Sequence, residues 1–147
     1  AVSVLEHSLS IQKNYSQTYY LLAVAKDQLG DREGAISALE KAREVVPEDW
    51  VSAFQLGILY SREGYVEKAK EMGEIALQLN PKEKNIHLFL ASLYDKLKER
   101  DKAILEIENL SKEFPENEAY QKMLENLKSG KPIFEGIEKE KLPIFAF

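Results

Sequence analysis

The chain has 147 residues, 44% of them hydrophobic and 31% charged, so it can bury one ordinary core and does not have the composition of a disordered chain. Its formal net charge of -5 leaves no basic surface for phosphate contacts, which argues against nucleic acid as a partner. Without cysteine it has no disulfides, thiolate metal ligands or thiol nucleophiles, and no stretch is long and apolar enough to predict a membrane-spanning segment.

The chain repeats itself with a period of 34 residues, the separation between Pro47, Pro81 and Pro115. Small and large apolar residues recur in the same register: Ala35, Ala69 and Ala103; Leu22, Leu56 and Leu90; Ala23, Gly57 and Ala91. A period of this length is typical of stacked helix pairs. We therefore predict an all-α solenoid of antiparallel helix pairs.

The predicted elements follow this register along the chain. Residues 1–15 are expected to form the second helix of a partial repeat, as in a fragment of a longer protein, because Ala1 and Ser8 lie one period before Ala35 and Ala42. Each complete repeat, 16–49, 50–83 and 84–117, should hold two amphipathic helices. The predicted helices are 16–29 and 32–45, 50–62 and 66–79, and 84–97 and 101–113. Residues 118–128 continue the register as a capping helix.

The residues at fixed places in the repeat have separate physical roles. Gly30 and Gly64 stand at the turn between paired helices, where a left-handed conformation ends a helix at little cost, and Lys98 holds the same place less easily. The small residues let paired helices approach closely. Large side chains should fill the space around each crossing: Leu22, Leu56, Leu90, Tyr60 and Tyr94.

These residues resemble the tetratricopeptide-repeat (TPR) family, whose signature is W-x2-L-G-x2-Y, then A-x3-F, then P. The second repeat matches it best, with Leu56-Gly57, Tyr60, Ala69 and Pro81. The sequence departs from the family pattern at six positions: Tyr19, Ala53 and His87 replace Trp, Lys26 replaces Tyr, Gly73 replaces Phe, and Leu110 replaces a usual Ala. The resemblance covers residues 16–117. It implies a TPR domain over residues 1–130, built as a right-handed solenoid whose first helices line a concave groove for a peptide or protein partner.

A second apolar face on the first helices is the candidate groove. Its apolar members are Tyr20, Val24, Phe54, Ile58 and Leu88, and its polar rim includes Gln17, Gln55, Arg62, Asn85 and Ser92. An apolar groove with a polar rim suits a peptide, whereas the alternative is that these side chains only pack against neighbouring helices. One TPR subclass clamps a chaperone's terminal carboxylate with Lys, Asn and Arg. Those places here hold Tyr20, Val24, Gln55, Asn85 and Phe89, so the resemblance implies mainly apolar recognition.

Nothing in the sequence predicts catalysis, a cofactor or a metal site. His7 and His87 are the only histidines, and His87 lies on the core stripe of its helix, where a packed imidazole is expected rather than a general base. Pairs of acidic residues, the other candidates for acid–base chemistry, lie among lysines on helix faces that are expected to be solvated. We therefore expect a binding module and not an enzyme.

Residues 131–147 form an apolar tail without helical or strand period. Fully extended, it would reach about 55 Å at roughly 3.3 Å per residue, enough to run back along a three-repeat groove. One hypothesis is that it docks on a TPR surface, its own or a neighbour's, and imitates or blocks a ligand, through Ile133, Phe134, Ile144, Phe145 and Phe147. The other is that it begins a further domain or repeat. The alternative to a binding module is accordingly a scaffold that self-associates through the tail or the open N-terminal end.

Overall fold

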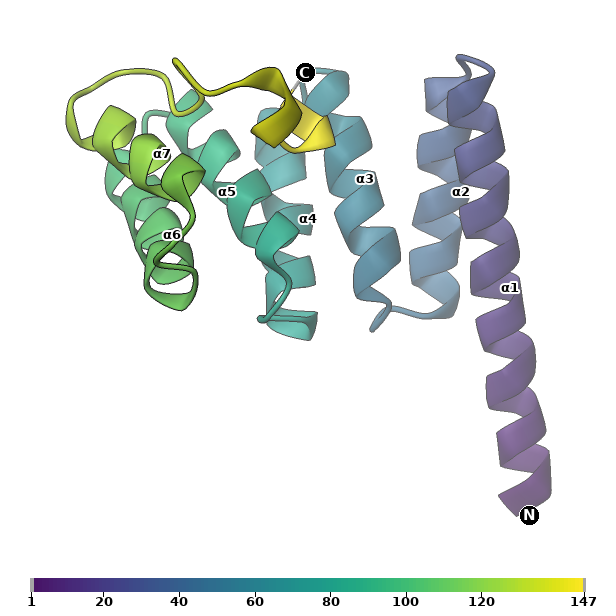
Figure 1. The fold of residues 1–147 in the computed structure, drawn as a ribbon. Helices are drawn as coiled ribbons and strands as arrows, with labels where there is room; N and C mark the ends of the chain where they lie inside the picture. Colours follow the sequence, from purple (N-terminus) through teal and green to yellow (C-terminus); the bar gives the residue numbers. More distant parts are fainter. Residues whose placement is uncertain (1, 147) are drawn as a thin grey trace. The chain divides into compact units, whose positions relative to one another are not determined.

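The computed structural model describes residues 2–146. It assigns residues 2, 3, 5, 8, 9, 13 and 144 to helices but does not describe their side chains. The described chain is helical, without strands, and divides into two compact units, residues 1–79 and 80–147. The first unit holds α1 (Val2–Gln28), α2 (Arg32–Val45), α3 (Trp50–Arg62) and α4 (Val66–Leu79). The second holds α5 (Lys84–Lys96), α6 (Arg100–Glu113), α7 (Glu118–Lys128) and two 3-10 turns, η1 (Lys139–Lys141) and η2 (Ile144–Ala146). The predicted all-α fold of antiparallel helix pairs is confirmed (Figure 1).

Helix α1 corrects the predicted start of the chain. Two helices were expected, over residues 1–15 and 16–29, but α1 is continuous over 27 residues, and its first half extends beyond α2 (Figure 1). Lys13 stands one period before Pro47, so the proline that ends the second helix in the other repeats is absent here. At the expected break, Thr18 Oγ1 donates a hydrogen bond to the Asn14 carbonyl oxygen at 2.8 Å, within an unbroken helix. Among the described helices, none meets the bilayer-spanning criteria of length and apolarity.

The core of the first unit forms where small residues allow α1, α2 and α3 to approach. Ala23, Ala35 and Leu39 are buried together with Leu56 and Leu59. Tyr20, Ile36, Tyr60 and Met72 are partly buried against this cluster.

Two large residues of this unit depart from simple core packing. Leu22 was predicted to fill the space around the helix crossing, but it is 44% exposed, because no described helix covers that side of α1. Tyr60 is partly buried and its hydroxyl donates to Glu40 Oε1 at 2.7 Å, which joins α3 to α2.

The second unit has its own core between α5, α6 and α7. Ile86, Leu90, Ala91, Ala103 and Ile107 are fully buried, as the repeat register predicts for the crossing of α5 with α6. Tyr120, Met123 and Leu127 extend this core from α7. Helix α7 therefore covers the core of this unit, in the place given to the predicted capping helix.

The helix boundaries follow from capping residues in the repeat register. Asp49, Glu83 and Asn117, each 34 residues apart, are the N-caps of α3, α5 and α7, and their side chains accept hydrogen bonds from backbone N–H groups of the first turn. At the turn between the paired helices α5 and α6, Lys98 has a φ of 63°, the one positive value at a non-glycine residue in the described chain. Lys98 therefore adopts the left-handed conformation expected at this turn, which costs more for a residue with a side chain than for glycine.

His87 connects three parts of the second unit. Its Nδ1 lies 2.5 Å from Glu106 Oε2 on α6, and its Nε2 lies 2.7 Å from the carbonyl oxygen of Pro81. Both ring nitrogens therefore face acceptors, which favours the doubly protonated ring. The hydrogen bond to Glu106 raises the pKa of His87 above its ordinary value, against the opposing effect of burial.

We expect His87 to stabilise the fold more at low pH than at high pH. A pKa raised on folding gives a contribution that is complete below the unfolded value of about 6.5 and is lost as pH rises through the folded value. His87→Gln should therefore lower the free energy of unfolding by about 1 kcal/mol at pH 5.5, and by clearly less at pH 9. Urea unfolding at both pH values measures this, with His7→Gln as the matched control. Equal losses at the two pH values would contradict the assignment.

Candidate functional site

The tail contacts the side of the second unit formed by α5 and α7. Asn126 on α7 donates through Nδ2 to the carbonyl oxygens of Ile133 at 3.0 Å and of Glu135 at 2.8 Å. The backbone N–H of Ile133 donates to Asp95 Oδ2 on α5 at 3.2 Å. These three hydrogen bonds bind main-chain groups of the tail, so they do not depend on its side chains. The two helices thus bind the polypeptide backbone on a helical surface.

Apolar side chains of the tail supply the second kind of contact. Ile133 is buried, and the ring of Phe145 meets that of Phe89 on α5 edge-on, with 5.3 Å between centroids and planes at 77°. This geometry is favourable for an aromatic pair. A pocket of about 380 Å³ lies beside these residues, lined by Ser92, Asp95, Lys96, Pro132, Ile133, Phe134, Glu135, Phe145 and Ala146.

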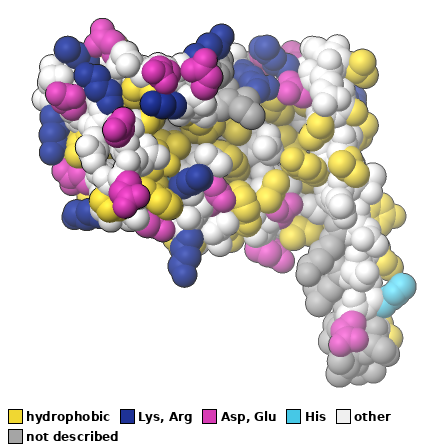
Figure 2. Space-filling model, in the orientation of Figure 1, with side chains coloured by type: hydrophobic (Ala, Val, Ile, Leu, Met, Phe, Trp, Pro, Cys, Tyr) yellow, Lys and Arg dark blue, Asp and Glu magenta, His cyan; other side chains and the backbone are white. Residues whose placement is uncertain are grey.

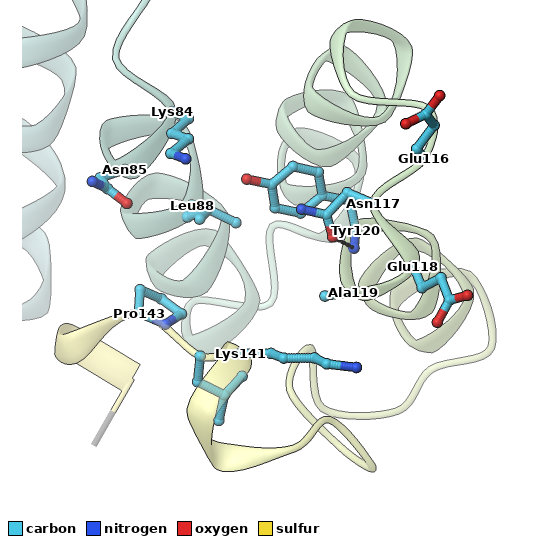
Figure 3. A pocket seen from close by; sticks show the side chains of 11 residues that line it. Lys84, Asn85, Leu88, Glu116, Asn117, Glu118, Ala119, Tyr120, Lys141 and Pro143 are labelled. Carbon is cyan, nitrogen blue, oxygen red and sulfur yellow. Dashed lines mark hydrogen bonds between the residues drawn. The ribbon is translucent and has the colours of Figure 1, made fainter.

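A second pocket, of about 540 Å³, lies where residues 141–143 of the tail pass α5 and α7 (Figure 3). Figure 3 shows the side chains of Leu88 and Tyr120 extending toward one another from the two helices, with Pro143 and Lys141 on the tail side. Burial, together with the nearby Glu113 carboxylate, raises the pKa of Tyr120. The pocket is lined by Lys84, Asn85, Leu88, Glu116, Asn117, Glu118, Ala119, Tyr120, Lys141, Leu142 and Pro143. Its size is within the range of ligand pockets.

The predicted groove residues of α5 all lie beside the tail. Asn85 and Leu88 line the larger pocket with Leu142 and Pro143, and Ser92 lines the smaller one with Ile133 and Phe145. We call this surface, made by Asn85, Leu88, Ser92, Ala119, Lys122 and Asn126, the α5–α7 groove.

The three α7 residues of this groove were not predicted, although the register contains them. Ala119, Lys122 and Asn126 follow Asn85, Leu88 and Ser92 by one period of 34 residues. Ala119 lines the larger pocket, Asn126 binds the tail, and Lys122 Cε lies 3.7 Å from where a Cβ on Gly136 would be. Extending the groove positions into the capping helix would have found all three.

The tail itself differs from the predicted extended segment. It makes local turns, in which the Glu135, Lys141 and Ala146 N–H groups bond to carbonyl oxygens three residues earlier. Gly136, with a φ of 71°, and two prolines favour turns over an extended path. Of the predicted docking residues, Ile133, Phe134 and Phe145 contact or line this surface, whereas the Ile144 side chain and Phe147 lie outside what the structure describes.

In the first unit, the predicted groove residues lie on α1 and α3. Hydrophobic side chains gather on this face between charged ones (Figure 2). Val24 is 37% exposed and Ile58 is half-buried, so both are accessible, whereas Phe54 is buried and belongs to the core. Of the polar residues, Gln17 is exposed and Gln55 half-buried, and Arg62 pairs with Asp27 at 3.0 Å, which joins the ends of α3 and α1.

Comparison with known proteins agrees with the geometry. Family models described as tetratricopeptide repeat match residues 16–47 and 60–127. The chain belongs to the tetratricopeptide-repeat family. Its helix pairs are those of TPR solenoids, and the TPR fold supports a role as a protein–protein interaction module. The sequence matches no curated protein.

Solved TPR structures share the fold at low sequence identity. The first TPR of Spaghetti (RPAP3), bound to the HSP90 peptide SRMEEVD, is 15% identical with a TM-score of 0.70, over 80% of this chain and 96% of that one. A TPR protein from Parabacteroides merdae is 24% identical with a TM-score of 0.73, over 78% of this chain and 46% of that one. MamA from Desulfovibrio magneticus is 19% identical with a TM-score of 0.70, over 80% of this chain and 67% of that one. At these identities the likeness concerns the fold alone.

Proposed function

We propose that this TPR chain is a binding module that takes a peptide or protein partner on the faces of its first helices, mainly through apolar contacts. One observation supports this above all: the repeat positions expected to bind a ligand on α5 line two pockets together with a polypeptide segment, the chain's own tail, which also donates a hydrogen bond to Asp95 on the same helix. The same repeat positions on α1 and α3 carry Val24 and Ile58, which are accessible apolar side chains. We propose no catalytic role for any residue.

The composition of the faces favours an apolar ligand over an acidic one. The RPAP3 domain was solved with a peptide ending in Glu-Glu-Val-Asp. In this chain the corresponding first-helix positions hold Tyr20, Val24 and Gln55 in the first unit, and Arg62 is already paired with Asp27. An acidic peptide would therefore find no accessible cluster of cationic side chains among these positions.

Peptide selection on the first unit tests this function. We expect peptides selected from a random library on the full chain to bind at least tenfold more weakly to Val24→Ser/Ile58→Ser, because both changes remove accessible apolar surface without cutting into the core. Fluorescence anisotropy gives the affinities. The matched control is Leu79→Ser/Leu105→Ser, which changes two exposed leucines of the second helices α4 and α6. The proposal fails if no peptide is selected, or if the selected peptides bind the two double variants equally.

A further inference from the structure

The contacts of the tail indicate what kind of segment the α5–α7 groove accepts. Main-chain groups around Ile133, which any polypeptide offers, make three hydrogen bonds: two carbonyl oxygens accept from Asn126, and one N–H group donates to Asp95. The side-chain contacts are more selective, because Pro143 borders the larger pocket and Phe145 packs edge-on against Phe89. The prolines and the short turns also keep this segment from forming an α-helix.

The tail buries fewer of its side chains than a helix of the repeat does. Apart from Ile133, its residues whose side chains are described are exposed or half-buried. Its backbone-to-backbone hydrogen bonds close local turns within the tail, except at its start, where the Lys131 N–H donates to the Asn126 carbonyl oxygen on α7. Segments with little buried apolar surface open at a lower free-energy cost than the core does. The groove can therefore exchange this segment while the helices stay folded.

From this geometry we propose that the α5–α7 groove binds a non-helical partner peptide that contains proline and an aromatic residue, and that the chain's own tail is a competitor for the same site. This inference rests on the proposed function. It names the class of partner for one of the two proposed binding faces, the α5–α7 groove of the second unit. An intramolecular competitor lowers the apparent affinity of a partner by the fraction of molecules with an open groove. Loosening the tail should therefore tighten the binding of a peptide added in solution.

The test uses the full chain and a fluorescent synthetic peptide with the sequence of residues 131–147. Phe145→Ala in the protein removes one aromatic contact of the competing tail but leaves the groove intact. We expect the peptide to bind this variant about tenfold more tightly than the unmodified chain, since an aromatic pair and its buried area are worth roughly a factor of ten. Phe145→Leu, which keeps most of the apolar surface, should lie between the two. A peptide of the same composition in scrambled order should not bind.

A second substitution tests whether the peptide binds in the α5–α7 groove. Asp95→Ala, added to the Phe145→Ala chain, removes the acceptor for the backbone N–H of the bound segment and should weaken peptide binding about fivefold. Asp27→Ala is the matched control, because Asp27 has the same place in its repeat, two periods earlier, and belongs to the first unit. Thermal melts by circular dichroism verify that each variant is folded.

Two results would overturn the inference. The first is equal peptide affinity for the unmodified chain and Phe145→Ala, which would mean that the tail does not compete. The second is an equal effect of Asp95→Ala and Asp27→Ala, which would put the peptide elsewhere. Either result leaves the binding of library peptides to α1 and α3 unaffected, so this failure and the failure of the proposed function are distinguishable.

Discussion

Replacing Phe89 with alanine should lower the free energy of unfolding by about 3–5 kcal/mol, the range for truncating a buried aromatic ring. Phe89 is 1% exposed and is among the largest fully buried side chains of the second unit. It also holds the ring of Phe145, so its loss removes core packing and an anchor of the tail together. A change of this size is a large part of the stability of a typical domain. Denaturant unfolding followed by circular dichroism measures it.

The matched control for this change is Phe114→Ala. The Phe114 ring is 39% exposed and meets Tyr120 edge-on, so its truncation removes less buried surface and should cost about 1 kcal/mol. Because the two units have separate cores, we expect Phe89→Ala to make the second unit unfold at lower denaturant than the first. Equal losses for the two phenylalanines would mean that Phe89 is not part of a packed core.

The repeat register predicted most of the fold because several local signals agree at each boundary. Helices α2, α3, α4 and α7 begin and end at the predicted residues. At each repeat a proline ends the second helix, and Asp49, Glu83 or Asn117 caps the next first helix two residues later. Where the prolines and capping residues agree with the period, the helix boundaries can be predicted without knowing the tertiary contacts.

The errors lie where the register continues but a local signal is missing. A break was expected before residue 16 from the period alone, although Lys13 replaces the proline that would produce it. Leu22 was expected in the core from its register, but burial depends on a neighbouring helix and not on the residue itself. Period alone was therefore a poor guide on α1.

The tail shows a different limit, because an aperiodic segment has no register of its own. Ile133, one of the residues named in the docking hypothesis, is buried. The path of the tail depended on Asp95 and Asn126, whose side chains bind backbone groups that are the same in every sequence. The register gives the position of Asn126, one period after Ser92, but not the backbone groups that it binds.

We expect Asn126→Ala to lower the free energy of unfolding by about 2–3 kcal/mol and to release the tail. Asn126 is 1% exposed, and its Nδ2 group is the donor to the carbonyl oxygens of both Ile133 and Glu135. Without it the Ile133 carbonyl loses its donor at a buried residue, which costs more than the hydrogen bond itself contributes. Hydrogen exchange should show faster exchange of the tail amides, with the amides of α5 and α6 less affected. Asn109→Ala, at an exposed position of α6, should change stability by less than about 0.5 kcal/mol.

Asn126→Asp separates the donor role of this side chain from its packing. Aspartate has nearly the same shape but directs acceptor oxygens at two carbonyl oxygens that now lie 2.8 and 3.0 Å from the amide nitrogen. If the donor matters, Asn126→Asp is at least as damaging as Asn126→Ala, and a charge at a buried site raises the loss to about 4 kcal/mol. If only the filled volume mattered, Asn126→Asp would be the milder change. That outcome would contradict the role given to Asn126 in holding the backbone of a bound segment.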